Sequence, residues 1–430
     1  MLITLSFASA VAVQARLEED EMVAAQSMTA RRLDARGSTE TTSHDAAQLL
    51  AAIRDLAPSF AARSDEIESA RRVPGDIIDS LRRIGLFKSL VPRSHGGLEL
   101  SVPDVVTAIE LLSAADSSVG WVAMIATGSQ LFCTRLAPEI YGRVFADGAD
   151  PMVVGVGTPA GRAEMTDGGF RVSGRWPFSS GCQNAQWIVG HCVITRDGEP
   201  VMTDHGPLTR FVILPAERWR IEETWQASGL TGTGSHHVVL EHALVPAEMV
   251  FDALTGPSNV AGPFEAALAP FVSSLHGAVA VGIASAAVED LAALAKQGRR
   301  QLFANADLKD APVFQHAFGR LGASLRAARA LLRVQVVDQW VRALAGQLDA
   351  EADFVEGLQG SAWIHATCSD VVSGCYTLGG ASVIFSSSPL QRRLRDIHAA
   401  RQHVFAQERF YTQAGAIALG FPPVNPFFGH

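Results

Sequence analysis

Glycine-rich runs are the first candidates for chemistry in this chain, because backbone N–H groups in such runs can bind phosphates. Gly155-Val156-Gly157 has no later glycine at the spacing of a dinucleotide-binding turn, and the run from Gly229 to Ser235 lacks the lysine of a phosphate-binding loop. The last residues of that run resemble part of a hydrolase nucleophile turn, but His236 stands where the motif needs glycine. These runs therefore indicate neither a nucleotide site nor a serine hydrolase.

Metal-ligand and disulfide patterns are equally sparse. His236 and His237 are adjacent, so on a strand they point to opposite faces and are poorly placed to share a metal. The cysteines are odd in number and form no C-x-x-C pair: Cys133, Cys182, Cys192, Cys368 and Cys375. This pattern predicts no bound metal, no disulfide framework and a reducing, cytoplasmic location.

The chain carries little charge for its size. Its 430 residues hold 35 Lys and Arg against 44 Asp and Glu, a formal net charge of −9, and 18% of residues are charged. The acidic balance argues against a nucleic-acid or anionic membrane partner, and no stretch reaches the roughly 18 consecutive apolar residues of a membrane span. Soluble domains are roughly 25% charged, so the shortage predicts extra buried surface at subunit interfaces or around an apolar pocket.

The elements that must position any site fall into three parts behind an N-terminal extension. Apolar residues at helical spacing predict an all-α domain at 44–150, short runs between Gly, Asp and Pro predict a β domain at 151–252, and long Ala-rich stretches predict a helical bundle at 253–430. Residues 1–43 are expected to be a disordered extension. No Lys or Arg precedes its apolar start, which disfavours a secretory signal. A secretory signal stays an alternative, and so does a translation start at Met22 or Met28.

Four stretches carry one further pattern: Val154 to Ala163, Gly169 to Gly181, Gly229 to Pro246, and Leu378-Gly379-Gly380 followed by Pro389 to Asp396. Together with the α, β, α order they resemble the acyl-CoA dehydrogenase superfamily, in its branch of two-component, reduced-flavin-dependent (group D) monooxygenases. The resemblance covers about Asp55 to Gly420. It implies an N-terminal all-α domain, a middle β-barrel or sandwich and a C-terminal four-helix bundle.

The resemblance assigns a flavin-binding role to a set of hydroxyl, aromatic, glycine and basic residues. Ser179 falls where the family places a hydroxyl near flavin N5, and Thr158 lies on the strand that approaches the pyrimidine edge. Trp176 and Phe178 would form walls for the flat ring. The remaining members, which match backbone, phosphate or adenine contacts, are Ser180, Arg299, Arg300, Gln315, Gly379 and Gly380. From the residues alone, the serines could instead form a turn before Gly181, Trp176 could be core, and the others surface charges or helix caps.

The residues also separate the two branches of the family. A dehydrogenase needs a carboxylate that removes the substrate α-proton. In one branch this base lies eight residues after the position of Asp396, where this chain has Val404. In the other it lies about ten residues before the position of Gly282, where this chain has Val272, and the nearest carboxylate is Glu265. Both bases are missing, which favours a monooxygenase.

His403 stands beside Val404, where the resembling monooxygenases use a histidine, and with Ser179 it is the expected catalytic residue. An imidazole that titrates near neutral pH can take the proton of a phenol or indole. The alternative is a histidine satisfied within a helix. Trp121 and His95 are expected on the substrate side, with core packing as the alternative for Trp121.

The resemblance implies an oxygenase component that uses reduced FAD or FMN and O2, through a C4a-hydroperoxyflavin, to hydroxylate a small aromatic substrate of phenol or indole type. A separate NAD(P)H:flavin reductase would supply the flavin, and a homotetramer built through the C-terminal helices would account for the missing charge. Two other classes stay open: an acyl-CoA dehydrogenase-like flavin oxidoreductase or oxidase acting on acyl thioesters, and a noncatalytic flavin-binding scaffold.

Overall fold

A computed structural model describes residues 36–145, 150–260, 264, 269–298, 300, 304–348 and 351–422. The chain divides into two compact units, residues 1–48 and 49–430, and the second holds the sheet and every described helix after α2. Helix α2 (Arg36–Ala62) begins inside the segment expected to be disordered, because extending a helix costs far less than nucleating one. The expectations for residues 1–35 and for Arg299 lie outside the described residues.

The predicted N-terminal helical segment is present. Its described helices are α2, α3 (Ser64–Ala70), α4 (Gly75–Arg83), α5 (Val102–Ala115), α6 (Ser117–Cys133) and α7 (Pro138–Val144). Asp116 starts α6, since its carboxylate accepts hydrogen bonds from the N–H groups of Ser118 and Val119 at 2.9 and 3.0 Å. Helices α5 and α6 then pack closely, because a Cβ added at Gly120 would lie 2.0 Å from Ser113 Oγ. These contacts fix the first turns of α6.

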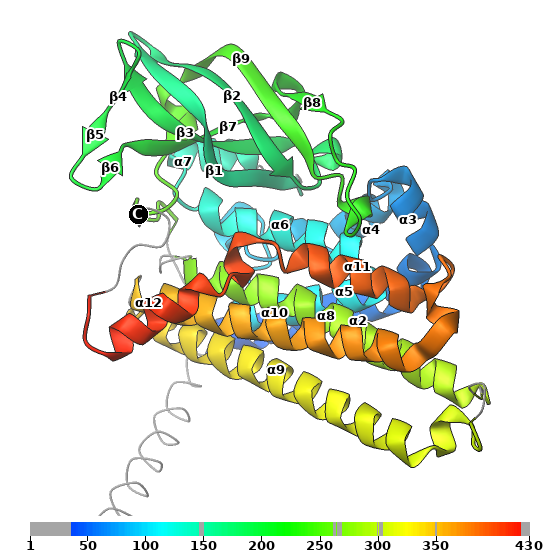
Figure 1. Ribbon diagram of the computed structural model, residues 1–430. Coiled ribbons are helices and arrows are strands. Elements are labelled where there is room, and N and C mark those ends of the chain that lie inside the picture. The colour runs from blue at the N-terminus through cyan, green and yellow to red at the C-terminus, as the bar shows by residue number, and fades with distance from the viewer. Residues whose placement is uncertain are drawn as a thin grey trace, which may run out of the picture. The chain divides into compact units, whose positions relative to one another are not determined.

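The middle segment is built on one mixed sheet. Its strands are β1 (Val153–Thr166), β2 (Gly169–Ser179), β3 (Trp187–Arg196), β4 (Glu199–Pro200), β7 (Thr209–Pro215), β8 (Arg220–Glu222), β9 (His236–Pro246) and β10 (Val250–Phe251). Strands β5 (Met202–Thr203) and β6 (Gly206–Pro207) pair with each other as a separate two-stranded sheet. The order of the main sheet is β10-β7-β3-β1-β2-β9-β8, with β4 beside β3; β1 and β3 are parallel and the other pairs are antiparallel. The expected barrel or sandwich is thus one main sheet by its pairing, and α6 packs against β1 (Figure 1).

Trp176 belongs to the core of this sheet and not to a ligand-facing wall. Its side chain has no exposed surface, and its Nε1–H donates to the His191 carbonyl at 2.6 Å. Cβ atoms added at Gly161, Gly174 and Gly190 would lie 2.0, 2.7 and 3.0 Å from the indole. Three glycines on three strands therefore make the slot that holds the ring, and the flavin-wall expectation for Trp176 was wrong.

Gly161→Ala is expected to lower the stability of the protein by about 1–3 kcal/mol, because the new methyl group overlaps an indole that has no room to move. Thermal unfolding measures the loss. Gly168→Ala, in the turn of the same hairpin, is the control, since its Cβ would meet nothing within 4 Å. Equal melting temperatures for the two variants would contradict the slot.

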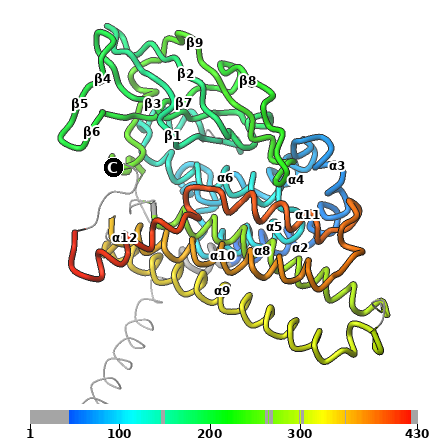
Figure 2. The backbone as a smooth tube through the Cα atoms, viewed as in Figure 1, coloured from blue at the N-terminus to red at the C-terminus, as the bar shows by residue number. Residues whose placement is uncertain are grey.

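The C-terminal segment forms the predicted helical bundle. Its helices are α8 (Ala269–Lys296), α9 (Pro312–Leu344), α10 (Ala352–Gly379), α11 (Pro389–Ala400) and α12 (Arg409–Ala418). The α8–α9 and α10–α11 connections lie at one end of the bundle, and the turn after α11 lies at the other (Figure 2). Residues 270–296 of α8 are long and apolar enough to cross a membrane, but 67% of the most apolar window is buried in the protein. The helix is a core element of the bundle.

Candidate active site

His403 lies in a turn rather than on a helix. The sequence predicted a helix to about His403, but α11 ends at Ala400 and His403 has extended backbone, φ −64° and ψ 147°. Its Nδ1 accepts a hydrogen bond from the Phe405 N–H at 3.3 Å, which caps the short helix Val404–Ala406. A backbone N–H can only donate, so Nδ1 holds the lone pair and Nε2 carries the hydrogen of the neutral ring.

Aromatic and imidazole rings from three parts of the chain meet at this turn. The ring of His276, on α8, stacks on His403 with centroids 4.1 Å apart and an interplanar angle of 20°. Trp121, on α6, presents edge contacts to His276 at 5.4 Å and to His403 at 5.6 Å. Phe405 lies 5.0 and 5.2 Å from the same two imidazoles. We call these four residues the ring cluster; it brings Trp121 and His403 into contact.

The two valines at the dehydrogenase base positions lie beside the ring cluster. Val272 forms a buried apolar core with Phe405 and with the neighbouring side chains Phe354, Leu358 and Phe410, and Val404 packs against the same core. The two positions that carry the carboxylate base in the two dehydrogenase branches therefore lie against the same core. In this chain both positions hold valine. A valine cannot take an α-proton.

The imidazoles of the region are held neutral. Burial, together with the charge of His365, lowers the pKa of His403 to about 3. Burial lowers the pKa of His365, on α10, to about 4, although its hydrogen bond to the Ser361 carbonyl opposes the shift. Burial also lowers the pKa of His276 well below its ordinary value, with His403 and His365 adding to the effect. At pH 7 these rings act as hydrogen-bonding groups without charge.

Sequence reasoning missed His276 and His365. Neither residue is a carboxylate, so comparing the chain with the two dehydrogenase base positions did not identify them. A usable signal was there, because His276 follows Val272 by four residues and so lies on the same face of the helix.

A chain of hydrogen bonds fixes Trp121. Its Nε1–H donates to Ser180 Oγ at 3.1 Å, Ser180 Oγ lies 2.7 Å from Ser235 Oγ, and Ser235 Oγ lies 2.7 Å from Thr233 Oγ1. Thr233 donates onward to the Leu230 carbonyl at 2.7 Å, so each hydroxyl donates away from Trp121. Such a directional chain strengthens each of its members. The hydroxyl of Ser180, expected to contact the cofactor, instead positions Trp121.

Three of the expected flavin residues lie where β1 and β2 leave the regular ladder. Residues 157–160 of β1 stand opposite the single residue His191 of β3, and Thr158 within them is exposed. Phe178 on β2 has φ +64° and a ring that is 63% exposed. Ser179 is fully buried, and its Oγ lies near the Cys182 thiol but makes no well-formed hydrogen bond to the described residues. Exposed strand backbone, an exposed ring and an unsatisfied hydroxyl are groups that suit the edge and face of a flavin.

The other expected residues lie away from this strip. Arg300 pairs with Asp307 at 3.0 Å in the α8–α9 connection, and Gln315, at the start of α9, donates to the Lys309 carbonyl. Gly379 and Gly380 end α10, at the same end of the bundle. The half-buried ring of His95 presents its edge to Tyr141 at 4.8 Å, so the expected substrate contact of His95 has no support in the described contacts.

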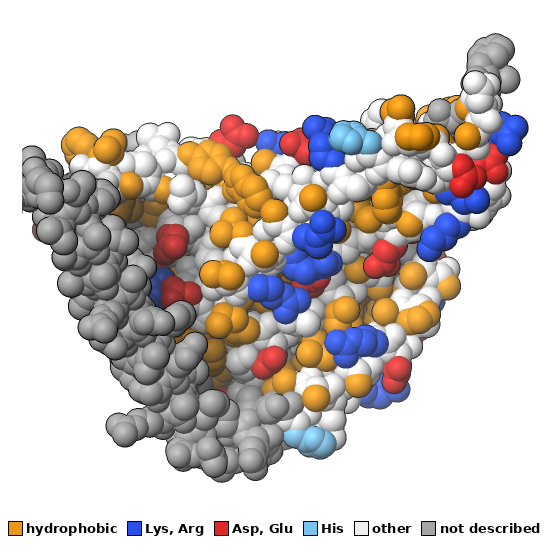
Figure 3. All heavy atoms as spheres, turned by 90° about the horizontal axis from the view of Figure 1, so that it is seen from below, with side chains coloured by type: hydrophobic (Ala, Val, Ile, Leu, Met, Phe, Trp, Pro, Cys, Tyr) orange, Lys and Arg blue, Asp and Glu red, His pale blue; other side chains and the backbone are white. Residues whose placement is uncertain are grey.

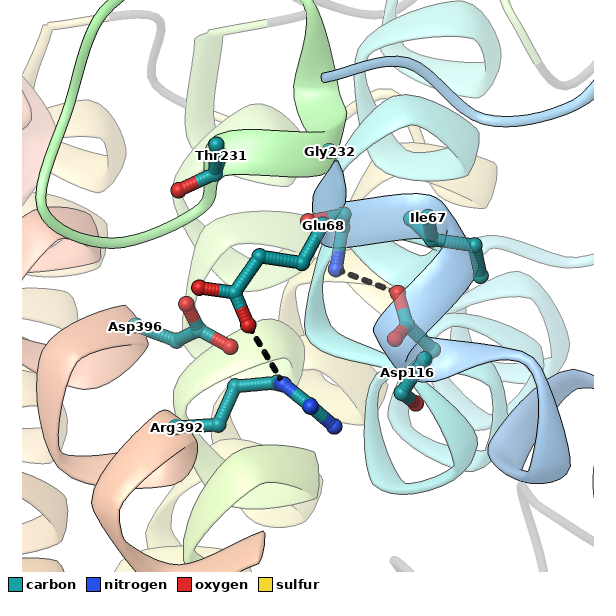
Figure 4. A pocket seen from close by; sticks show the side chains of 9 residues that line it. Ile67, Glu68, Asp116, Thr231, Gly232, Arg392 and Asp396 are labelled. Atoms are coloured by element: carbon teal, nitrogen blue, oxygen red, sulfur yellow. Dashed lines mark hydrogen bonds and ion pairs between the residues drawn. The ribbon is translucent and has the colours of Figure 1, made fainter. Parts of the chain in front are cut away.

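The loop that ends the hydrogen-bond chain also joins the sheet to the helices. The Leu230 N–H donates to Asp396 Oδ1 at 2.7 Å, and burial raises the pKa of that carboxyl to about 6. Beside it lies a small cleft, where Glu68 pairs with Arg392 at 2.9 Å (Figure 4). The cleft is lined by Ser64, Ile67, Glu68, Asp116, Ser118, Thr231, Gly232, Arg392 and Asp396. Within the described parts of the chain, no group of three or more His, Cys, Asp or Glu residues is arranged to hold a metal ion.

Comparisons with known proteins bear on the whole chain. Residues 43–137 match the N-terminal domain and residues 274–408 the C-terminal domain of acyl-CoA dehydrogenase. The chain is 33% identical over 379 residues to indole-3-acetate monooxygenase of Pseudomonas putida, covering 87% of this chain and 93% of that protein. It is 29% identical over 404 residues to the oxygenase component of FADH2-dependent resorcinol hydroxylase of Rhizobium sp. (strain MTP-10005), covering 88% and 96%. The crystal structure of 3-HSA hydroxylase from Rhodococcus sp. RHA1 matches with a TM-score of 0.81 at 26% identity, covering 88% of this chain and 98% of that one.

Proposed function

The chain belongs to the acyl-CoA dehydrogenase superfamily and, within it, to the flavin-dependent monooxygenases, and we propose that it hydroxylates a small aromatic substrate of phenol or indole type. As an oxygenase component it takes reduced FAD or FMN from a separate NAD(P)H:flavin reductase and uses O2. The observation that carries this proposal is the ring cluster, in which Trp121 and His403 meet beside two valines at the base positions. The relatives named for indole-3-acetate and resorcinol support the two ring types.

Thr158, Phe178 and Ser179 are the residues that would hold the flavin. Phe178 offers an exposed face, and Thr158 lies on exposed strand backbone. The Ser179 hydroxyl is buried near the Cys182 thiol and makes no well-formed hydrogen bond to the described residues. Burying a hydroxyl without a hydrogen bond costs the protein about 1–3 kcal/mol of stability. A hydrogen bond to the polar edge of the flavin would remove this cost. When bound, the reduced flavin reacts with O2 and supplies the oxygen atom that enters the substrate.

The ring cluster would hold the aromatic substrate. The rings of the cluster contact one another. The aromatic ring of a substrate would replace one of these edge contacts with a contact of the same kind, so the apolar surfaces would stay buried. Trp121 keeps its orientation during this exchange because the hydroxyl chain holds its indole N–H. The buried core around Val272 excludes water from the same place.

The geometry revises the role expected for His403. The acceptor atom of its ring is occupied by the Phe405 N–H, so the ring offers a donor at Nε2. We infer that His403 donates a hydrogen bond to the substrate oxygen, or to the oxygen being transferred, and holds the hydrogen there. A proton arriving on Nδ1 would have to break the bond from Phe405 and charge a ring whose pKa is about 3.

The proposal is tested with 18O2. The full-length chain, supplied with reduced flavin by a reductase, is incubated with resorcinol or indole, and the products are analysed by mass spectrometry. One labelled oxygen atom per product molecule is expected. If no label enters either ring, while oxidised flavin on the protein accepts electrons from acyl-CoA esters, the dehydrogenase alternative is correct.

Ser179→Ala is expected to weaken reduced-flavin binding about 5–10-fold, the cost of about one hydrogen bond. Anaerobic titration of the protein with reduced flavin measures the dissociation constant. Ser179→Thr keeps the hydroxyl and should restore part of the affinity. Ser173→Ala, on the same strand, removes a hydroxyl that accepts from the His242 N–H and should leave flavin binding unchanged. Equal affinities of wild type and the Ser179→Ala variant would remove Ser179 from the flavin site.

The assembly and location follow as further parts of the proposal. Helix α9 carries exposed apolar residues at spacings of three and four, between 37% and 69% exposed: Leu331, Val334, Val337, Val341 and Leu344. Figure 3 views the side on which α9 lies and shows hydrophobic side chains spread among charged ones. We propose that this face packs in a homotetramer in which Arg300 and Gln315 of one subunit reach the flavin of another. All five cysteines are buried and free, which supports a cytoplasmic location.

A further inference from the structure

His276 contributes to the ring cluster a buried ring nitrogen that has no described hydrogen-bond partner. Its side chain is 1% exposed, and its Nδ1 has no hydrogen-bond partner among the described residues. By contrast, the Trp121 N–H is bonded to Ser180, and His403 Nδ1 accepts from Phe405. Leaving a buried polar atom unsatisfied is costly, so such an atom inside a candidate substrate site points to a group that arrives with the ligand.

The two stacked imidazoles have complementary hydrogen-bonding capacity. His403 holds its hydrogen on Nε2, as its bond from Phe405 requires. A neutral imidazole always keeps one nitrogen with a lone pair, and no described donor is bonded to His276 Nδ1. The rings lie 4.1 Å apart, so a ligand that reaches one also reaches the other. The pair therefore offers a donor and an acceptor to the same ligand.

We propose that His276 is a specificity-determining residue of this site, and that it accepts a hydrogen bond from an N–H or O–H group carried by the substrate ring. The inference rests on the proposed monooxygenase function and narrows its substrate class. Indoles and phenols qualify, because each carries a donor on or in the ring. Flat heterocycles without a hydrogen-bond donor, such as those with oxygen or sulfur in the ring, are disfavoured because they leave His276 unsatisfied.

The surroundings support an uncharged acceptor. The hydroxyls of Ser180 and Ser235 are both committed to the chain that holds Trp121, so they do not compete for the ligand. Burial keeps the pKa of His276 well below its ordinary value, and the titratable neighbours that add to this shift are His403 and His365. The lone pair is consequently available throughout the physiological pH range.

The test compares indole with benzofuran, which has nearly the same shape but an oxygen in place of the N–H. Binding of each to the full-length protein is measured by calorimetry in wild type and in His276→Phe, which keeps an aromatic ring and removes both nitrogens. Wild type is expected to bind indole at least 10-fold more tightly than benzofuran. In the variant this preference should fall to about twofold or less, while the benzofuran affinity changes less than about threefold.

Two further variants complete the test. His276→Gln retains a carbonyl acceptor and should keep part of the preference for indole, and it serves if the Phe variant does not fold. Ser274→Ala removes another buried hydroxyl without a described partner two residues earlier on α8, on the opposite face, and should leave both affinities unchanged.

The inference is overturned if wild type binds the two ligands equally, or if the Phe variant keeps the preference for indole. Failure of the proposed function would show separately, as the absence of 18O incorporation by wild type with any ring tested. A preference for indole that disappears in His276→Phe would support the inference in either case, because binding is measured without the flavin.

Discussion

Replacing His403 with glutamine is expected to lower the rate of product formation by about 10²–10³-fold, the usual cost of removing one donor aimed at a developing charge. The half-buried imidazole offers Nε2–H, and its orientation is fixed by the hydrogen bond from the Phe405 N–H to Nδ1 and by the ring of His276 stacked on its face. Oxygen consumption should continue, because the residues proposed to hold the flavin lie on β1 and β2. The lost product should therefore appear as hydrogen peroxide, and the ratio of peroxide to product is the measurement.

His398→Gln provides the matched control. His398 lies on α11 in the same stretch of chain, is exposed, and has a single described side-chain contact, with Ser373 Oγ at 3.3 Å. Its replacement should change neither the rate nor the ratio. If the His403 variant kept a wild-type ratio of product to peroxide, His403 would have no part in the reaction.

The sequence could place His403 and Trp121 in one site, but it could not show what surrounds them. The family resemblance identified both residues. In the structure, α6 and the turn after α11 lie side by side, and the ring centroids of Trp121 and His403 are 5.6 Å apart. The orientation of His403 depends on where α11 stops, and an Ala- and Arg-rich stretch gives no helix-breaking signal there. The imidazole itself takes up the Phe405 N–H and so competes with continuation of the helix.

The sequence could not predict the side-chain partners of Trp176 or Ser180, and the cause is the same for both. The slot for Trp176 is made by Gly161, Gly174 and Gly190, which come from three strands, and their convergence depends on sheet register. The partners of Ser180 are likewise distant in sequence, since Trp121 precedes it by 59 residues and Ser235 follows it by 55. Periodicity predicts which face of an element is buried, but it carries no information about such partners.

The double variant Val334→Glu, Val341→Glu is expected to convert the proposed tetramer of about 180 kDa to smaller species, down to the 45.7 kDa chain. Both valines are more than half exposed in the single chain and lie on the apolar face of α9. In a packed interface each new carboxylate would be buried without a partner, which costs several kcal/mol per group. Light scattering at micromolar concentration measures the mass.

The matched control, the sheet variant, places the same two charges on strands β5 and β9 of the middle segment, with Met202→Glu and Leu244→Glu. These side chains are 65% and 64% exposed, so the change in net charge and in surface hydrophobicity is similar. This control should retain the mass of wild type. Because Arg300 and Gln315 are proposed to reach the flavin of another subunit, the α9 variant should also bind reduced flavin more weakly, whereas the sheet variant should not. A wild-type mass equal to that of one chain, or an unchanged mass of the α9 variant, would contradict the proposed interface. The low content of charged residues would then have to be explained by the interior of the subunit.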